Sequence, residues 1–118
     1  MNRKDLEIRT KEFAISVIRF VGKLPKSKLT EVLGYQLLRS GTSIGANYRE
    51  AGRAESQADF IHKLSIVEKE ASETQYWLEL FKDTNTSNPK EVDTLLDEAS
   101  QLLAIFTSAG RTAKRRKK

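Results

Sequence analysis

Two glutamates in the second half of the chain are the residues best placed to do chemistry, because they lie about one helical turn apart. Glu70 and Glu73 belong to a line at spacings of four and three that begins at Ile66 and ends at Trp77. Paired carboxylates serve as acid and base in hydrolases when they face each other across a cleft, but these two share one convex helix face. The line is better suited to a mixed interface, in which apolar anchors exclude water and charges set the register. In the alternative interpretation, Trp77 covers the edge of a bundle and both glutamates are solvated.

Other catalytic groups are scarce. The sequence contains one histidine, His62, and no cysteine, so a single chain cannot assemble a His/Cys metal site or a cysteine nucleophile. The stretch from Gly41 to Gly45 lacks the lysine and the strand context of a phosphate-binding loop. We therefore predict that the protein is not an enzyme and has no cofactor, no metal and no small-molecule substrate.

Positive charge is the second chemical feature, and it is sorted along the chain. Residues 1–54 carry a net charge of +6, residues 55–110 carry −7 and residues 111–118 carry +6, for a total of +5. The terminal segment predicts phosphate contacts and an affinity for nucleic acid that falls steeply with salt; alternatively, it only keeps the protein soluble. It has no aromatic residue for base stacking and no apolar wedge that would hold it on a membrane. Its candidate nucleic-acid contacts are Arg111, Lys114, Arg115, Arg116, Lys117 and Lys118.

Four of the six glycines fall in one predicted helix, at Gly34, Gly41, Gly45 and Gly52. At about 100° per residue they share a strip about 40° wide. Each costs about 1 kcal/mol relative to alanine in a helix interior, so something must approach the backbone closely there. The candidates are a neighbouring helix of the same bundle, a second copy of the protein or a nucleic-acid backbone, and a helix break between Gly41 and Gly45 would dissolve the strip. The cations beside the strip, also candidate nucleic-acid contacts, are Arg39, Arg49 and Arg53.

Apolar residues recur at threes and fours in four segments, which predicts four helices. The first covers about residues 5–24 and the second about residues 29–54. The third follows Ser56 and Asp59, which resemble a capping box, and its apolar stripe ends at Phe81. After a polar loop at 83–88, Pro89 opens the fourth helix, and Gly110 is expected to end it.

These elements predict an all-α fold. Four amphipathic helices with short connections pack most simply as an up-down-up-down four-helix bundle. We expect the bundle to cover residues 1–110 as the single domain and residues 111–118 to form a disordered basic tail. No apolar run is long enough for a signal peptide or a membrane span, and the lack of cysteine fits a reducing compartment, so a cytoplasmic location is expected.

Three segments resemble a known family. They are Ser43–Ala51 (SIGANYREA), Phe60–Val67 (FIHKLSIV) and Glu70–Leu78 (EASETQYWL). The sequence over roughly residues 8–108 resembles the bacterial four-helix bundle proteins encoded in ribosomal RNA intervening sequences. The same family is similar to the accessory variability protein of diversity-generating retroelements. The resemblance leaves out the basic tail.

The resemblance implies a left-handed bundle that assembles into a homopentamer. It also implies a basic surface that binds nucleic acid and, in retroelements, a reverse transcriptase as partner. By position, it assigns the Ser43–Ala51 segment to contacts between protomers and part of the third helix to the matching surface. The candidate oligomer contacts are Gly41, Ser43, Gly45, Asn47, Ile66, Glu70, Glu73 and Trp77.

We expect a non-enzymatic homo-oligomer that binds nucleic acid, preferably RNA or an RNA–protein complex, through cations of the first two helices and the tail. Affinity would come from clustered charge with little base specificity. One alternative is a structural assembly module, or an accessory subunit of a reverse transcriptase, that contacts only protein. Another is a regulatory partner whose acidic helices mimic nucleic acid.

Overall fold

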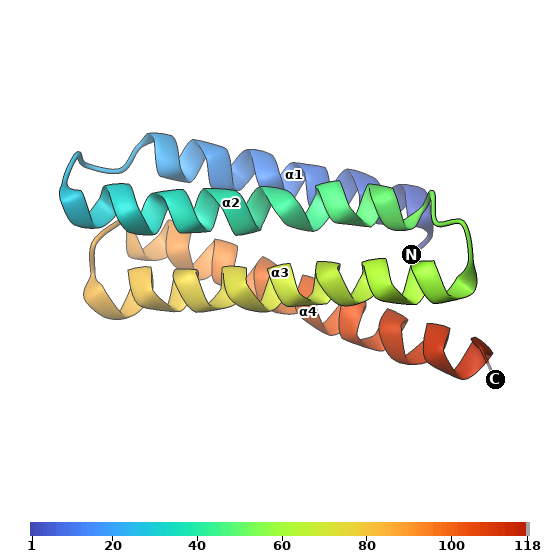
Figure 1. Ribbon diagram of the computed structural model, residues 1–118. Coiled ribbons are helices and arrows are strands. Elements are labelled where there is room, and N and C mark those ends of the chain that lie inside the picture. Colours follow the sequence, from blue (N-terminus) through green and yellow to red (C-terminus); the bar gives the residue numbers. More distant parts are fainter. Residues whose placement is uncertain (118) are drawn as a thin grey trace.

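The computed structural model describes residues 1–117, with the side chain of Lys117 and all of Lys118 outside that description. Figure 1 shows four helices lying alongside one another as a bundle. They are α1 (Arg3–Gly22), α2 (Lys28–Ala51), α3 (Gln57–Thr84) and α4 (Pro89–Lys117). The described chain contains no strand, so the all-α class is confirmed. The left-handed sense implied by the resemblance stays a prediction.

Polar side chains cap the helix starts by accepting hydrogen bonds from free backbone amides. Ser56 Oγ accepts from the Asp59 amide at 3.0 Å, and Asn88 Oδ1 accepts from two amides in the first turn of α4 at 2.9 and 3.2 Å. The predicted capping box differs in one bond, because the Asp59 carboxylate accepts from the Glu55 amide, at 3.2 Å, and not from Ser56. The hydrogen bonds that the Asp59 carboxylate accepts from Lys63 and from the Glu55 amide lower the pKa of Asp59.

The glycine strip of α2 receives α1 of the same chain. A methyl group added at Gly41 would lie 3.1 Å from the Val17 side chain, and one added at Gly45 would lie 3.1 Å from Thr10 Oγ1. Of the alternatives for the strip, the neighbouring helix of the same bundle is therefore confirmed. The possible break between Gly41 and Gly45 is absent, since α2 is continuous through both.

The core follows the apolar stripes that the sequence predicts. On α3 the stripe is buried at Leu64, Val67, Ala71, Thr74, Leu78 and Phe81. The rings of Phe20 and Phe81 meet edge to face with centroids 5.4 Å apart, and those of Tyr48 and Phe106 lie 5.2 Å apart. These aromatic pairs join α1 to α3 and α2 to α4, so all four helices share one core.

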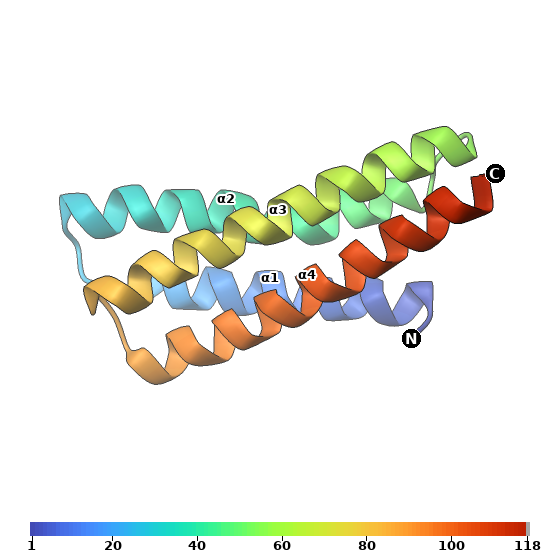
Figure 2. The ribbon, with the colours of Figure 1, turned by 90° about the horizontal axis from the view of Figure 1, so that it is seen from below.

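Long charged side chains connect α1 to α4. The Arg9 guanidinium donates to both carboxylate oxygens of Glu98 at 2.7 Å, and Lys23 pairs with Glu91 at 2.9 Å. The hydrogen bond with Glu98 raises the pKa of Arg9. Figure 2 shows the α3–α4 pair crossing the α1–α2 pair at an angle. Because α1 packs mainly against α2 and less against α4, its opposite face is exposed.

The fourth helix does not end at Gly110, and residues 111–117 are helical where a disordered tail was expected. Ala113 is buried at 3% exposure, and its carbonyl oxygen accepts a hydrogen bond from Gln57 Nε2 at 3.1 Å. The buried Ala113 is an apolar anchor that the charge pattern of this segment did not indicate. Continuous packing against the start of α3 therefore outweighs the helix-ending tendency of Gly110. Lys118 lies outside the described residues.

Candidate nucleic-acid and oligomer surfaces

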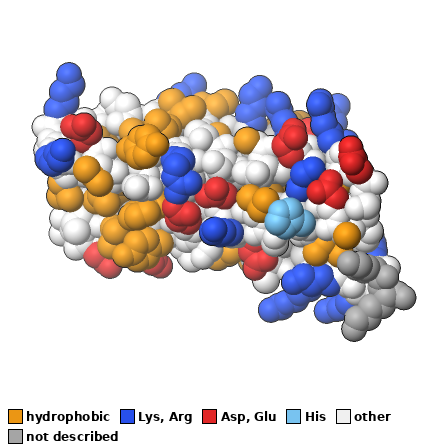
Figure 3. Space-filling view, viewed as in Figure 1, with side chains coloured by type: hydrophobic (Ala, Val, Ile, Leu, Met, Phe, Trp, Pro, Cys, Tyr) orange, Lys and Arg blue, Asp and Glu red, His pale blue; other side chains and the backbone are white. Residues whose placement is uncertain are grey.

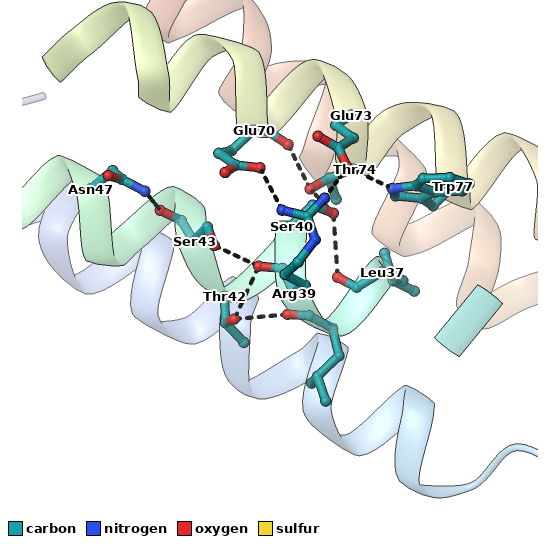
Figure 4. Close-up of polar contacts among 11 residues, drawn as sticks. Leu37, Arg39, Ser40, Thr42, Ser43, Asn47, Glu70, Glu73, Thr74 and Trp77 are labelled. Carbon is teal, nitrogen blue, oxygen red and sulfur yellow. Dashed lines mark hydrogen bonds and ion pairs between the residues drawn. The ribbon is translucent and has the colours of Figure 1, made fainter. Parts of the chain in front are cut away.

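A cluster of charged residues joins α2 to α3 (Figure 4). Arg39 pairs through Nη2 with Glu73 Oε1 and through Nη1 with Glu70 Oε1, the latter at 3.7 Å. The indole Nε1 of Trp77 donates to the same Glu73 oxygen at 3.3 Å. Three of the predicted oligomer contacts and one predicted nucleic-acid contact thus meet inside one chain. The positive charge of Arg39 is therefore compensated by two carboxylates of its own chain.

Beneath this cluster, two buried hydroxyl groups link the same helices. Thr74 Oγ1 lies 2.9 Å from Ser40 Oγ and 2.8 Å from the carbonyl oxygen of Glu70. Both residues are fully buried. This buried polar pair favours one register of α2 against α3, because a shift would break the bond between the two hydroxyls and leave each with only a carbonyl oxygen of its own helix, Leu37 for Ser40 and Glu70 for Thr74. The apolar stripe of the third helix predicted from the sequence runs through Thr74, but no local pattern indicates Ser40 as its partner.

Glu70 is the least well satisfied member of the cluster. Its side chain is 16% exposed, and Oε1 is buried with no hydrogen-bond donor among the described residues. Burial raises the pKa of Glu70 from its ordinary value, while Arg39 opposes that shift. Glu70 therefore depends on Arg39 for electrostatic compensation.

The remaining predicted oligomer contacts divide between the inside of the bundle and its surface. Gly41 and Gly45 contact α1, as described above. Ser43 Oγ donates to the carbonyl oxygen of Arg39 at 2.6 Å, and Asn47 Nδ2 donates to that of Ser43 at 2.8 Å. Both hydrogen bonds join residues within α2, and Ser43 and Asn47 are half-buried beside α3. Ile66 is half-buried as well.

Six of the cations that form no ion pair with described side chains lie at one end of the bundle. The C-terminal ends of α2 and α4 both lie there, together with the N-terminus of the chain (Figure 1). Figure 3 shows Lys and Arg side chains above and below a smaller acidic group at that end. No described side chain forms an ion pair with the six cations, all of which are exposed. They are Arg49, Arg53, Arg111, Lys114, Arg115 and Arg116.

A shallow notch in this end is lined by Arg3, Glu7, Arg49, Glu50 and Arg53. A methyl group at Gly52 would lie 3.1 Å from Arg3 Nε, so the glycine gives the guanidinium room to lie against the end of α2. Arg3 Nε also pairs with a carboxylate oxygen of Glu7 at 3.4 Å. Two arginines of the notch remain without an acidic partner in the described chain. Sequence reasoning missed Arg3, because its position beside Gly52 depends on the register of α1 against α2.

These six cations and the nucleic-acid contacts predicted from the sequence overlap only in part. Arg49 and Arg53 lie at the same end of the bundle as the α4 cations, whereas Arg39 lies in the acidic cluster, away from that end. The side chains of Lys117 and Lys118 lie outside the described residues. We name Arg49, Arg53, Arg111, Lys114, Arg115 and Arg116 the basic end.

Other functional chemistry is sparse in the described part of the chain. Among residues 1–117, no group of three or more His, Asp or Glu side chains is close enough to hold a metal ion. No described helix is both long and apolar enough to cross a membrane. His62 lies exposed on α3.

Comparison with known proteins decides the family. Residues 4–108 match the family described as 23S rRNA-intervening sequence protein. The chain belongs to this family. The resemblance inferred from the three sequence segments is thereby confirmed. The family match ends at residue 108, so the α4 cations of the basic end lie beyond it.

One solved relative supports the same assignment. A crystal structure of a protein with unknown function from the S23 ribosomal protein family of Bacteroides thetaiotaomicron VPI-5482 is 39% identical to this chain. The similarity covers 87% of this chain and 95% of that one, with a TM-score of 0.81. None of the curated proteins matches the chain.

Proposed function

We propose that this protein binds nucleic acid, with RNA as the preferred ligand, through the basic end of the bundle. The observation that carries the proposal is that six exposed cations without acidic partners, from the C-terminal end of α2, the residues just after it and α4, lie at one end of the bundle. The name of the family refers to a ribosomal RNA intervening sequence, which favours RNA over DNA as the ligand. No catalytic step is part of this proposal.

The chemistry of the basic end suits phosphate contacts more than base recognition. Arginine and lysine neutralise phosphates and release counterions, so the logarithm of affinity falls linearly with the logarithm of salt concentration. A folded α4 holds Arg111, Lys114, Arg115 and Arg116 on one element, which lowers the entropy cost of ordering them on the ligand. Cations near a helix C-terminus also interact favourably with the helix dipole, a stabilising role that is compatible with binding.

Self-association is the second part of the proposal, and a homopentamer is the form implied by the family resemblance. Several copies in one particle would present several basic ends to one nucleic acid. Linked sites raise the apparent affinity without any new contact, provided that the geometry permits simultaneous engagement. The charge sorting between the two helical pairs supports association of unlike faces.

A salt titration tests nucleic-acid binding directly. Binding of a labelled structured RNA would be measured between about 50 and 200 mM salt, where phosphate contacts weaken most visibly. The test variant carries Arg111→Gln, Lys114→Gln, Arg115→Gln and Arg116→Gln. The matched control carries Lys26→Gln, Lys28→Gln, Lys69→Gln and Lys90→Gln, which removes the same charge from exposed residues that form no ion pair with described side chains.

The expected result is a steep salt dependence for the wild type. The slope should shrink by about 1 for each basic-end cation that is removed. The control should keep the wild-type slope. Nucleic-acid binding by the basic end is rejected if the wild type fails to bind at low salt, or if both variants lose the same amount of slope.

A structural assembly module is the second candidate function, and one observation favours it. Large apolar side chains are exposed on three helices, among them Ile18 at 50%, Val32 at 49% and Tyr76 at 53%. Exposed apolar groups that cluster mark protein contacts more often than nucleic-acid contacts. Oligomerisation without any RNA binding in the titration above would favour this function.

A further inference from the structure

The outer face of α1 carries a second apolar line, opposite the one that faces the core. Ile8, Ile15 and Ile18 are exposed by 49%, 37% and 50%. Together with other exposed residues of α1, they form a line in which spacings of four and three residues alternate. The full line, here called the isoleucine seam, is Lys4, Ile8, Lys11, Ile15, Ile18 and Gly22.

Such spacing is typical of a helix that packs against another helix. The inner line of α1 already has that partner in the core, where Phe13, Val17 and Phe20 are buried. The outer line has no partner among the described residues. A single exposed isoleucine needs no explanation, but three on one heptad line form a helix-packing surface.

The charges of the seam indicate which kind of surface would cover it. Lys4 and Lys11 lie in the seam and form no ion pair with described side chains, and the seam contains no carboxylate. Two seams facing each other would bring four lysines into one interface without compensation. The seam therefore needs a partner that combines apolar groups with negative charge.

The structure offers such a surface on α3. Tyr76 is 53% exposed, its ring lies 5.2 Å from that of Trp77, and Leu80 one turn further on is half-buried. Glu79 is exposed beside them and forms no ion pair within the described chain. We call Tyr76, Trp77, Leu80 and Glu79 the Tyr76 patch. In Figure 3, hydrophobic side chains gather over one half of the α2–α3 face.

We infer that the isoleucine seam of one copy docks on the Tyr76 patch of a second copy. The seam carries Lys4 and Lys11 and the patch carries Glu79, all exposed and without ion pairs in the described chain, so the two surfaces are complementary in charge as well as apolar. The contact joins two different surfaces, and a contact of that kind repeats around an axis and closes into a ring when the rotation permits. This inference rests on the proposed self-association and names its contact.

Two exposed substitutions test the contact without touching the core. Ile15→Asp places a charge in the seam and Tyr76→Asp places one in the patch. Ser16→Asp and Ser108→Asp introduce the same charge as controls, at exposed positions of α1 and α4 that lie outside the seam and the patch. Native mass measurement and sedimentation give the particle mass, and circular dichroism confirms that each variant keeps its helices.

The wild type and both controls should form multimers of the 13.4 kDa chain, while each Asp variant alone should be a monomer. Mixing the two variants should restore one contact, because the first retains an intact patch and the second an intact seam. The mixture should therefore give a heterodimer of twice the monomer mass that cannot grow further.

Each of the remaining outcomes contradicts a different part of the inference. A multimeric Ile15→Asp variant removes the seam from the interface and leaves self-association standing. A monomeric Ile15→Asp variant with an unaffected Tyr76→Asp variant shows that the seam contacts some other surface. A wild type that is monomeric at all concentrations refutes self-association itself, whereas RNA binding by that monomer would leave the basic end intact.

Discussion

Arg39 and Arg53 belong to the same part of the chain and differ in what surrounds them. Arg39 lies in the middle of α2, where Glu70 and Glu73 of α3 compensate its charge. Arg53 lies just beyond the C-terminal end of α2 and has no acidic partner in the described chain. The number of cations in a segment therefore does not indicate how many of them are available to bind phosphate. What matters is the position of each cation relative to the acidic face of α3.

The largest effect should come from removing the whole basic end. A variant with glutamine at all six cations of the basic end should lose about 6 from the magnitude of the salt slope and fail to bind RNA near physiological salt. Filter binding and fluorescence anisotropy measure this loss. Retention of most of the wild-type slope would mean that other cations carry the binding.

Arg39→Gln should act on stability instead of binding. The substitution leaves the half-buried carboxylates of Glu70 and Glu73 adjacent and uncompensated, which should lower the free energy of unfolding by about 1–2 kcal/mol. Urea denaturation measures the change. Adding Glu73→Gln to the same chain should recover part of the loss, and an absence of any recovery would contradict the pairing.

Gly110→Ala should stabilise the helix that carries the α4 cations. The added methyl group would meet only Glu68 Oε1 at 3.8 Å, which is ordinary contact, so the gain in helix propensity is not offset by a clash. We expect an increase of about 0.5–1 kcal/mol in the free energy of unfolding. Gly41→Ala is the matched control, since its methyl group meets Val17 at 3.1 Å and should destabilise the protein. Thermal denaturation of both variants distinguishes these effects.

Glu70→Gln should have the smallest effect, less than about 0.5 kcal/mol at pH 7, because the variant loses an attraction to Arg39 and also a burial cost. The pKa of Glu70 is raised by burial from its ordinary value of 4.5, so the folded state binds the proton more tightly than the unfolded state. The Glu70 contribution to stability is therefore fully present below that ordinary value and is lost as pH rises through the raised pKa. Lowering the pH from 7 toward 4.5 should stabilise the wild type relative to Glu70→Gln. A difference that moves in the opposite direction would contradict the raised pKa.

The sequence predicted the helices well because each carries its own local signals. The stripe from Leu64 to Phe81 and the cap at Ser56 follow from spacing and side-chain chemistry alone. The end of α4 could not be predicted in this way. Gly110 favours a helix end locally, and only the contacts of Ala113 with the start of α3 explain why the helix continues.

The candidate site was predictable in composition but not in arrangement. The sequence singled out Arg39 as a nucleic-acid contact and Glu73 and Trp77 as contacts between copies, and did not bring the three together. Their meeting within one chain depends on the register of α2 against α3, which the buried pair of Ser40 and Thr74 helps to fix. No local pattern encodes that register. The same limit applies to the isoleucine seam, whose exposure becomes visible only when the inner face of α1 is known.

The most direct test of the account compares two single substitutions of one type, Arg39→Gln and Arg53→Gln, in RNA binding as a function of salt. The account predicts a slope reduced by about 1 for Arg53→Gln and a slope equal to the wild type for Arg39→Gln. Equal slopes for the two variants, or a larger reduction for Arg39→Gln, would contradict the claim that unpaired cations at one end of the bundle carry the binding.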